Sequence, residues 1–150
     1  MTMTILYISI SGNTRSFAKR LQEYAEQQHT SDSQNPLIQL KEIHENSPLE
    51  TEQDPFFVFV PTYLEGGNGV DNGDQEILTE SMREYLAFGD NFRKCLGVVG
   101  SGNKNFNRQY CLTAKQYAAQ FDFPFLADYE LRGTSADLET IYTILKNSTD

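Results

Sequence analysis

Cysteine is scarce in this sequence, and the two cysteines present form no known binding pattern. Cys95 and Cys111 are the only ones in 150 residues, and their spacing matches neither CxxC nor a zinc motif. The cysteine-dependent phosphatase loop is excluded as well, because Ser101 and Tyr117 stand where that loop needs arginine. We expect two buried thiols in a reducing compartment, with a redox pair only if the fold brings them together.

A basic excess and long apolar runs are also missing. The chain has 12 Lys and Arg against 21 Asp and Glu, a formal net charge of −9. Non-specific nucleic-acid binding needs a cationic face, and so does docking on an anionic membrane. No stretch approaches the ~20 apolar residues of a membrane span, and the first residues lack the cationic region of a secretory signal. We therefore expect a cytoplasmic protein with no nucleic-acid or membrane partner.

Glycine and proline are too rare for a collagen-like or linker protein, at 10 and 5 residues. A hydrophobic content of 39% with 12% aromatics is in turn too high for a disordered chain. The length fits the usual size of one domain and is sufficient for a hydrophobic core. We expect residues 1–150 to form a single domain.

Short apolar runs predict the strands of a parallel sheet. Most of them are almost continuously apolar, as in strands covered on both faces, and one more polar run is typical of an edge strand. The predicted strands are 4–10, 56–60, 96–100 and 125–129, with 37–43 at the edge. Residues 29–36 and 44–55 are polar and predict connections.

Helical periodicity separates these runs. Apolar residues recur every three or four positions in segments 17–25, 77–86, 110–121 and 138–145, and residues 134–137 predict a capping box before the last segment. Alternating strands and helices indicate an open α/β sheet with helices on both faces. Five strands favour the flavodoxin-like order 2-1-3-4-5 over a six-stranded dinucleotide fold.

Ligands of such sheets bind beyond the carboxyl ends of the strands, where the winding direction switches. After the first strand, small and hydroxyl-bearing residues lead directly into a helix: Ser9, Ser11, Gly12, Asn13 and Thr14. Backbone N–H groups at a helix start, with short hydroxyl donors, can hold an anion without lysine. The pattern is not a Walker loop, and an ordinary helix cap is the alternative interpretation.

After the third strand comes a glycine-rich segment that contains Thr62, Tyr63, Gly66 and Gly67. Glycines permit close backbone approach to a planar ligand, and Tyr63 could stack on a ring. A surface loop with an incidental tyrosine is the alternative. The acidic residues at 71, 74 and 76 are expected to form a solvated patch rather than a metal site.

After the fourth strand, Ser101, Gly102 and Asn103 offer hydrogen bonds to the polar edge of a heterocycle, and Phe106 is a second stacking candidate. The string lacks the third glycine of a dinucleotide fingerprint. Taken together, the three loops predict one site, with a phosphate at the first loop and a flat ring between the other two.

Residues for independent acid–base or nucleophilic chemistry are not evident. His29 and His44 lie in or near polar connections and are expected at the surface, and Val60–Pro61 replaces the aspartate that a receiver domain requires. A protein of this kind relies on a cofactor for the reaction and supplies binding and electrostatics itself.

Three motifs resemble those of known families. Ser9-x-Ser11-Gly12-Asn13-Thr14 is similar to the phosphate loop of flavodoxins, while residues 100–106 and 125–134 resemble NrdI, the small flavodoxin-like protein that accompanies class Ib ribonucleotide reductase. The likeness spans nearly the whole chain and is most specific in residues 99–134.

The resemblance implies FMN as the cofactor and the radical-bearing small subunit of class Ib ribonucleotide reductase as a partner. In that family the reduced flavin reacts with dioxygen, and the superoxide formed allows a tyrosyl radical to assemble at a dimanganese site of the partner. An unidentified reductant of the flavin is implied too. By analogy the first loop holds the phosphate, and Tyr63, Gly66, Gly67, Gly102 and Asn103 surround the ring. The Gly66–Gly67 peptide could flip at small steric cost to meet the reduced ring.

Other functions stay open from the sequence. An electron-transfer flavodoxin serving other enzymes, and a binding module without cofactor, are compatible with the same loops. Segment 64–74 is longer and more acidic than the second loop of many family members, so a divergent paralogue with another partner is a further alternative.

Overall fold

The computed structural model describes residues 1–62, 64–65, 75–76, 79–103 and 110–149. Its elements follow in chain order: β1 (Thr2–Tyr7), α1 (Asn13–Ser31), β2 (Leu37–Glu42), β3 (Phe56–Pro61), β4 (Leu64–Glu65), β5 (Gln75–Glu76), α2 (Glu80–Ala87), the 3₁₀ helix η1 (Phe88–Lys94), β6 (Cys95–Gly102), α3 (Leu112–Phe121), β7 (Phe125–Glu130) and α4 (Ser135–Ser148).

The main sheet has five parallel strands in the order β2-β1-β3-β6-β7. This confirms the predicted order 2-1-3-4-5, because β4 and β5 form a separate antiparallel pair. All six residues of the central strand β3 are buried, which explains its uninterrupted apolar run. The more polar β2 lies at the edge, as predicted.

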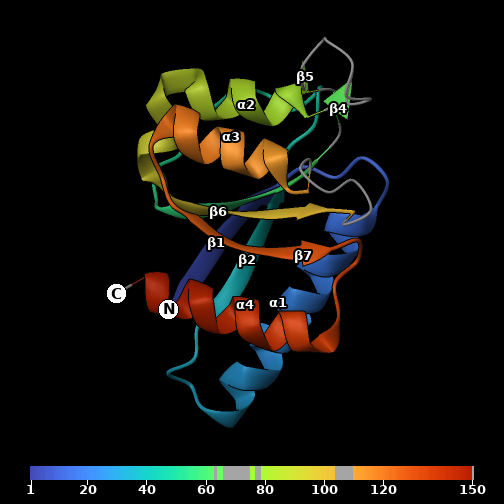
Figure 1. The fold of residues 1–150 in the computed structure, drawn as a ribbon. Helices are drawn as coiled ribbons and strands as arrows, with labels where there is room; N and C mark the ends of the chain where they lie inside the picture. The colour runs from blue at the N-terminus through green and yellow to red at the C-terminus, as the bar shows by residue number, and fades with distance from the viewer. Residues whose placement is uncertain (63, 66–74, 77–78, 104–109, 150) are drawn as a thin grey trace.

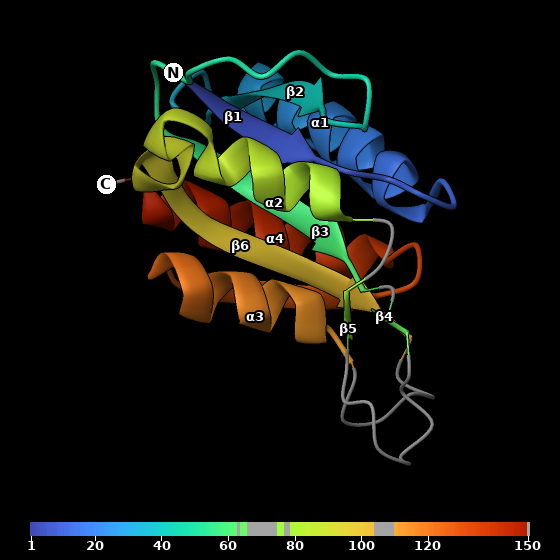
Figure 2. The same cartoon turned by 90° about the horizontal axis from the view of Figure 1, so that it is seen from above.

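Helices cover both faces of the sheet, with α1 and α4 on one side and α2 and α3 on the other (Figures 1 and 2). Alternate strand residues therefore enter two cores. Phe57 and Phe59 pack with residues of α1 and α4, such as Phe17, while Phe56 and Val58 pack with residues of α2 and α3.

The first strand and first helix depart from their predicted bounds. β1 ends at Tyr7, although the predicted strand reached Ile10, because residues 9–11 turn towards the start of α1 and leave Ile10 41% exposed. α1 continues to Ser31, into the predicted connection at 29–36. Its last turns are polar because that end of the helix is largely exposed, so apolar periodicity could not detect them.

The 3₁₀ helix η1 and the β4–β5 pair were not predicted. Strands of two residues are too short to show a pattern. In η1 the backbone passes through positive φ at Gly89 and Asp90. The buried amide of Asn91 then donates to the carbonyls of Glu50 and Tyr85 and accepts the Glu52 N–H, which attaches the connection at 44–55 to the fold.

The last helix begins as predicted. The Thr134 hydroxyl accepts the N–H of Asp137, and the Asp137 carboxylate accepts the N–H of Thr134, which completes a capping box. In the parts of the chain described above, no helix combines the length and apolar character needed to cross a membrane.

Candidate functional site

The start of α1 is only partly capped. Gly12 at the cap position has φ 93°, a left-handed conformation, and no side chain to offer, while the Ser9 hydroxyl accepts the Arg15 N–H of the first turn at 3.2 Å. A Cβ at Gly12 would have no atom within 4 Å, so the space beside the cap is free. The first turn of this 19-residue helix holds no acidic residue. Its N–H groups and dipole therefore favour an anion at this point.

The charged groups beside this helix start are already paired. Arg15 contacts Glu42 through Nε–Oε1 at 3.0 Å and Nη2–Oε2 at 2.5 Å, and the Tyr7 hydroxyl donates to the same carboxylate at 2.9 Å. The hydrogen bond from Arg15 lowers the pKa of Glu42. Burial, and then the bond to Glu42, raise the pKa of Tyr7 to about 12. The Arg15 charge is thus engaged by Glu42 at the ends of β1 and β2.

The carboxyl ends of β3 and β6 lie side by side, and the start of α3 packs against them. The Thr62 N–H donates to the Ser101 carbonyl at 3.0 Å, and the Thr62 hydroxyl accepts the Thr113 N–H at the start of α3 at 3.3 Å. At Gly102 a Cβ would lie 3.1 Å from the Cys111 nitrogen. This crowding explains a glycine at the end of β6, a strand that runs two residues beyond the predicted end at 100.

Tyr129 lies between the start of α1 and the end of β6. Its ring stacks on Phe17 of α1 with centroids 3.9 Å apart, and its residue is 2% exposed. The hydroxyl lies near Ser101 and Thr14, yet it has no hydrogen-bond partner within the described residues. Burial raises the pKa of the phenol, and the two neighbouring hydroxyls act in the opposite direction.

The structure accounts for nine of the residues that the sequence singled out. Thr14, Thr62 and Ser101 converge at the strand ends through the contacts given above. Around the start of α1 lie Ser9, whose hydroxyl accepts the Arg15 N–H at 3.2 Å, the exposed Ser11, and the half-buried Gly12 and Asn13. Gly102 ends β6 and Asn103 follows it, both partly buried. Tyr63, Gly66, Gly67 and Phe106 lie outside the described residues, as do Asp71 and Asp74.

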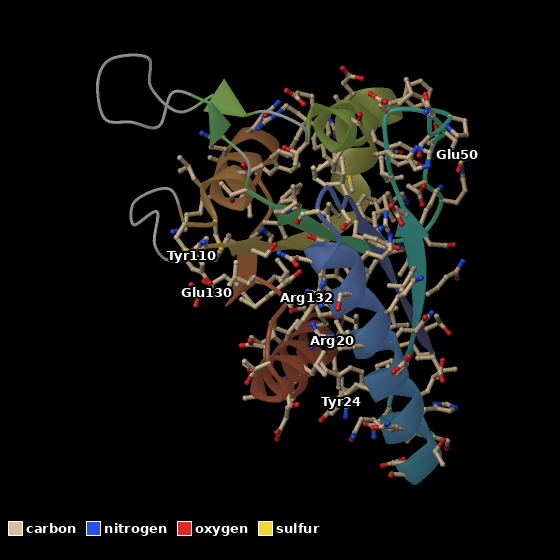
Figure 3. The ribbon with its side chains drawn as sticks, turned by 90° about the vertical axis from the view of Figure 1, so that its right-hand side faces the viewer. Arg20, Tyr24, Glu50, Tyr110, Glu130 and Arg132 are labelled. Carbon is tan, nitrogen blue, oxygen red and sulfur yellow. The ribbon has the colours of Figure 1, made fainter. Side chains whose placement is uncertain are left out.

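A pocket that sequence reasoning missed lies at the end of β7. It has a volume of about 480 Å³ and is lined by residues 128–134 together with Tyr110 and Asp137. The Tyr110 hydroxyl donates to Asp128 at 3.0 Å across it, and Figure 3 shows Tyr110 and Glu130 on this side. The predicted site was confined to the ends of the first, third and fourth strands. Because ligands of such sheets bind beyond the carboxyl ends of the strands, the end of the fifth predicted strand also points to residues 130–134.

Both cysteines are buried thiols, as predicted. Burial raises the pKa of the Cys95 thiol to about 12, so this sulfur does not ionise near neutral pH. Among the described residues no cluster of His, Cys, Asp and Glu is arranged to hold a metal ion.

These features fit a mononucleotide. A phosphate suits the glycine cap at Gly12, where the N–H groups of the helix start meet the short hydroxyls of the first loop. The buried hydroxyls of Tyr129 and Thr113, which have no partner among the described residues, lie near the carboxyl ends of β3 and β6.

Comparison with known proteins decides the family. The sequence profile of the family described as "NrdI Flavodoxin like" matches residues 5–143. The chain belongs to the NrdI flavodoxin-like family. This is a family of flavodoxin-type flavoproteins associated with ribonucleotide reductase.

Individual relatives agree with the family assignment. A protein of Streptococcus pyogenes serotype M18 described as NrdI-like is 51% identical over 144 residues, which cover 95% of this chain and 91% of that protein. Protein NrdI of Bartonella tribocorum is 30% identical, covering 92% and 89% of the two chains.

Solved structures agree with the fold. A short-chain flavodoxin associated with a bacterial microcompartment superposes with a TM-score of 0.62 at 17% identity, covering 99% of this chain and 97% of that one. The two-electron reduced flavodoxin of Megasphaera elsdenii gives a TM-score of 0.55 at 12% identity, covering 99% and 98%. At such low identity the match concerns the fold alone.

Proposed function

We propose that this chain is a cytoplasmic FMN-binding redox protein that activates the radical-bearing small subunit of class Ib ribonucleotide reductase. The observation that carries the proposal is the glycine-capped start of α1, which has no acidic residue in its first turn and follows β1 where the carboxyl ends of β1, β3 and β6 lie side by side. Family membership supports it, because the family is linked to ribonucleotide reductase.

Each loop has a role in this proposal. The hydroxyls and N–H groups of Ser9, Ser11, Gly12, Asn13 and Thr14 bind the phosphate. The other residues predicted from the sequence surround the ring: Thr62, Tyr63, Gly66, Gly67, Ser101, Gly102, Asn103 and Phe106. The chain itself contributes binding, orientation and charge.

When bound, FMN would supply one-electron reduction of dioxygen to superoxide, with electrons from a separate reductant and with the dimanganese site of the partner as the consumer of that oxidant. Negative charge close to the ring would disfavour an anionic form of the reduced cofactor through Coulomb repulsion.

Two experiments test the proposal in order. The purified chain, freed of bound flavin, is titrated with FMN while flavin fluorescence is followed, and saturable quenching is expected. The reduced FMN-loaded protein is then mixed with the manganese-loaded small subunit and air, and the tyrosyl radical is measured by electron paramagnetic resonance. No radical above a control without this chain would defeat the activating role. Retained FMN binding with electron delivery to other acceptors would then favour an ordinary flavodoxin.

A further inference from the structure

Arg132 extends from the turn between β7 and α4 to the start of α1. Its Nε donates to the side-chain oxygen of Asn13, the first residue of α1, at 3.2 Å. The turn itself is held by Arg20, which donates to the carbonyls of Arg132 and Gly133. Figure 3 shows Arg20 and Arg132 in neighbouring positions beside α1. The Arg20 contacts hold the backbone of the turn, and the contact with Asn13 places the Arg132 guanidinium at the helix N-terminus.

This is an unfavourable place for a cation without a counter-ion. The N-terminus of a helix carries about half a positive charge, and the first turn of α1 contains no acidic residue that would offset it. Arg132 forms no ion pair with a carboxylate in the described parts of the chain, whereas Arg15 in the same region is paired with Glu42. An anion between the helix start and Arg132 would neutralise both positive groups.

A second observation, independent of Arg132, concerns a buried hydroxyl beside the first turn of α1. The Tyr129 hydroxyl is buried beside Thr14 in the first turn of α1 and has no hydrogen-bond partner among the described residues. A buried hydroxyl without a partner is unfavourable by about 1–3 kcal/mol. A bound group with oxygen acceptors near Thr14 would remove that penalty.

We infer that Arg132 is a phosphate-binding residue of the mononucleotide site, reaching it from the turn after the last strand. The inference rests on the proposed function, since it assigns a residue to the proposed phosphate. The planar guanidinium can form two parallel hydrogen bonds to phosphate oxygens. A lysine at this place would supply only a point charge.

The test compares two ligands that differ by the phosphate. Dissociation constants for FMN and for riboflavin are measured by fluorescence quenching with the parent chain, Arg132→Gln, Arg132→Lys and the control Arg15→Gln. Arg132→Gln is expected to weaken FMN binding roughly ten- to a hundredfold, as for loss of a charged hydrogen bond, and to change riboflavin binding less than about twofold. Arg132→Lys should weaken FMN binding by an intermediate factor. Arg15→Gln should leave the ratio of the FMN and riboflavin dissociation constants as it is in the parent chain.

The outcomes separate the two claims. If the parent binds no FMN, the proposed function fails. If the parent prefers FMN to riboflavin and Arg132→Gln keeps the same preference, the inference is overturned while the proposed function stands. If Arg15→Gln loses as much of the preference for FMN as Arg132→Gln does, the inference is overturned as well. The effect would then come from removing any positive charge near the helix start. Circular dichroism checks that each variant is folded, and Arg132→Lys takes the place of Arg132→Gln in the comparison if the latter does not fold.

Discussion

Two buried tyrosine hydroxyls in this protein have opposite surroundings. Tyr142 on α4 donates to the Pro36 carbonyl at 2.7 Å, while Tyr129 on β7 has no partner among the described residues. A hydrogen bond contributes about 1 kcal/mol net, whereas an unpaired buried hydroxyl destabilises by about 1–3 kcal/mol. The same Tyr→Phe change should therefore have different effects at the two positions.

Tyr129→Phe is expected to leave the free energy of unfolding of the flavin-free protein unchanged or to raise it by about 1–3 kcal/mol, because an unpaired hydroxyl is removed. Tyr142→Phe should lower it by about 1 kcal/mol or more, because the Pro36 carbonyl loses its donor. Urea unfolding followed by circular dichroism measures both. A loss at Tyr129 as large as that at Tyr142 would show that the Tyr129 hydroxyl is satisfied within the chain.

Thr14 is 1% exposed in the first turn of α1. If its hydroxyl meets the phosphate, Thr14→Val should weaken FMN binding by about 1–3 kcal/mol, because one donor to the anion is lost. Titration with FMN checks this. Thr143→Val on the exposed face of α4, where the hydroxyl bonds only the Glu139 carbonyl, is the matched control and should bind FMN like the parent. Equal affinity in Thr14→Val would reject the assignment.

At the scale of the elements, two glycines at helix starts have different reasons for being glycine. Gly12 before α1 has φ 93° and open space at the Cβ position, whereas Gly133 before α4 has φ 74° and a Cβ position 2.5 Å from the Phe17 ring. The second glycine lets the β7–α4 turn pack on the Phe17–Tyr129 stack. This packing brings Arg132 to the start of α1.

Gly133→Ala should therefore destabilise the fold more than Gly12→Ala. Both substitutions force a residue with a side chain into the left-handed region, at about 1–2 kcal/mol. Gly133→Ala adds a steric clash of about 1–3 kcal/mol. Thermal unfolding of the two variants and the parent measures the difference. Equal melting temperatures for the two variants would contradict the packing explanation.

The Arg15–Glu42 pair joins α1 to β2 and makes stability depend on pH. The folded-state pKa of Glu42 is below its usual value of 4.5, chiefly because Arg15 donates to it. The contribution of ionised Glu42 to the free energy of unfolding is therefore fully present above about pH 4.5. It is lost as the pH falls through the lower pKa of the folded state. Urea unfolding between about pH 7 and pH 3 should show a steeper loss of stability in the parent than in Glu42→Gln. Parallel curves would mean that the pair contributes nothing.

At the scale of the whole molecule, the fold buries both thiols, and Cys95 belongs to the core on the α2–α3 side of the sheet. Cys95 and Cys111 are 9% and 0% exposed, and ionisation of Cys95 is suppressed by burial. A thiol reagent at about pH 8 should react slowly with the native protein and rapidly with two thiols per chain in denaturant, since thiolate exposure controls the reaction. One fast-reacting thiol in the native state would show that a core opens locally.

Much of the architecture was predictable because it depends on local pattern. The continuous apolar run at 56–60 indicated a strand buried on both faces, and the capping box at 134–137 marked the start of the last helix. The polar end of α1 and the short β4–β5 pair have no such pattern, so their existence could not be predicted.

The loops after the first, third and fourth strands were predicted as one site because parallel strands place their carboxyl ends at the same edge. Within that site, the sequence by itself determined which residue types could meet a phosphate. Tertiary packing alone decided that Arg15 is paired with Glu42, while Arg132, from the turn after the last strand, lies at the start of α1. The physical reason is that charge pairing depends on distances of a few ångströms between distant segments, which local periodicity does not encode.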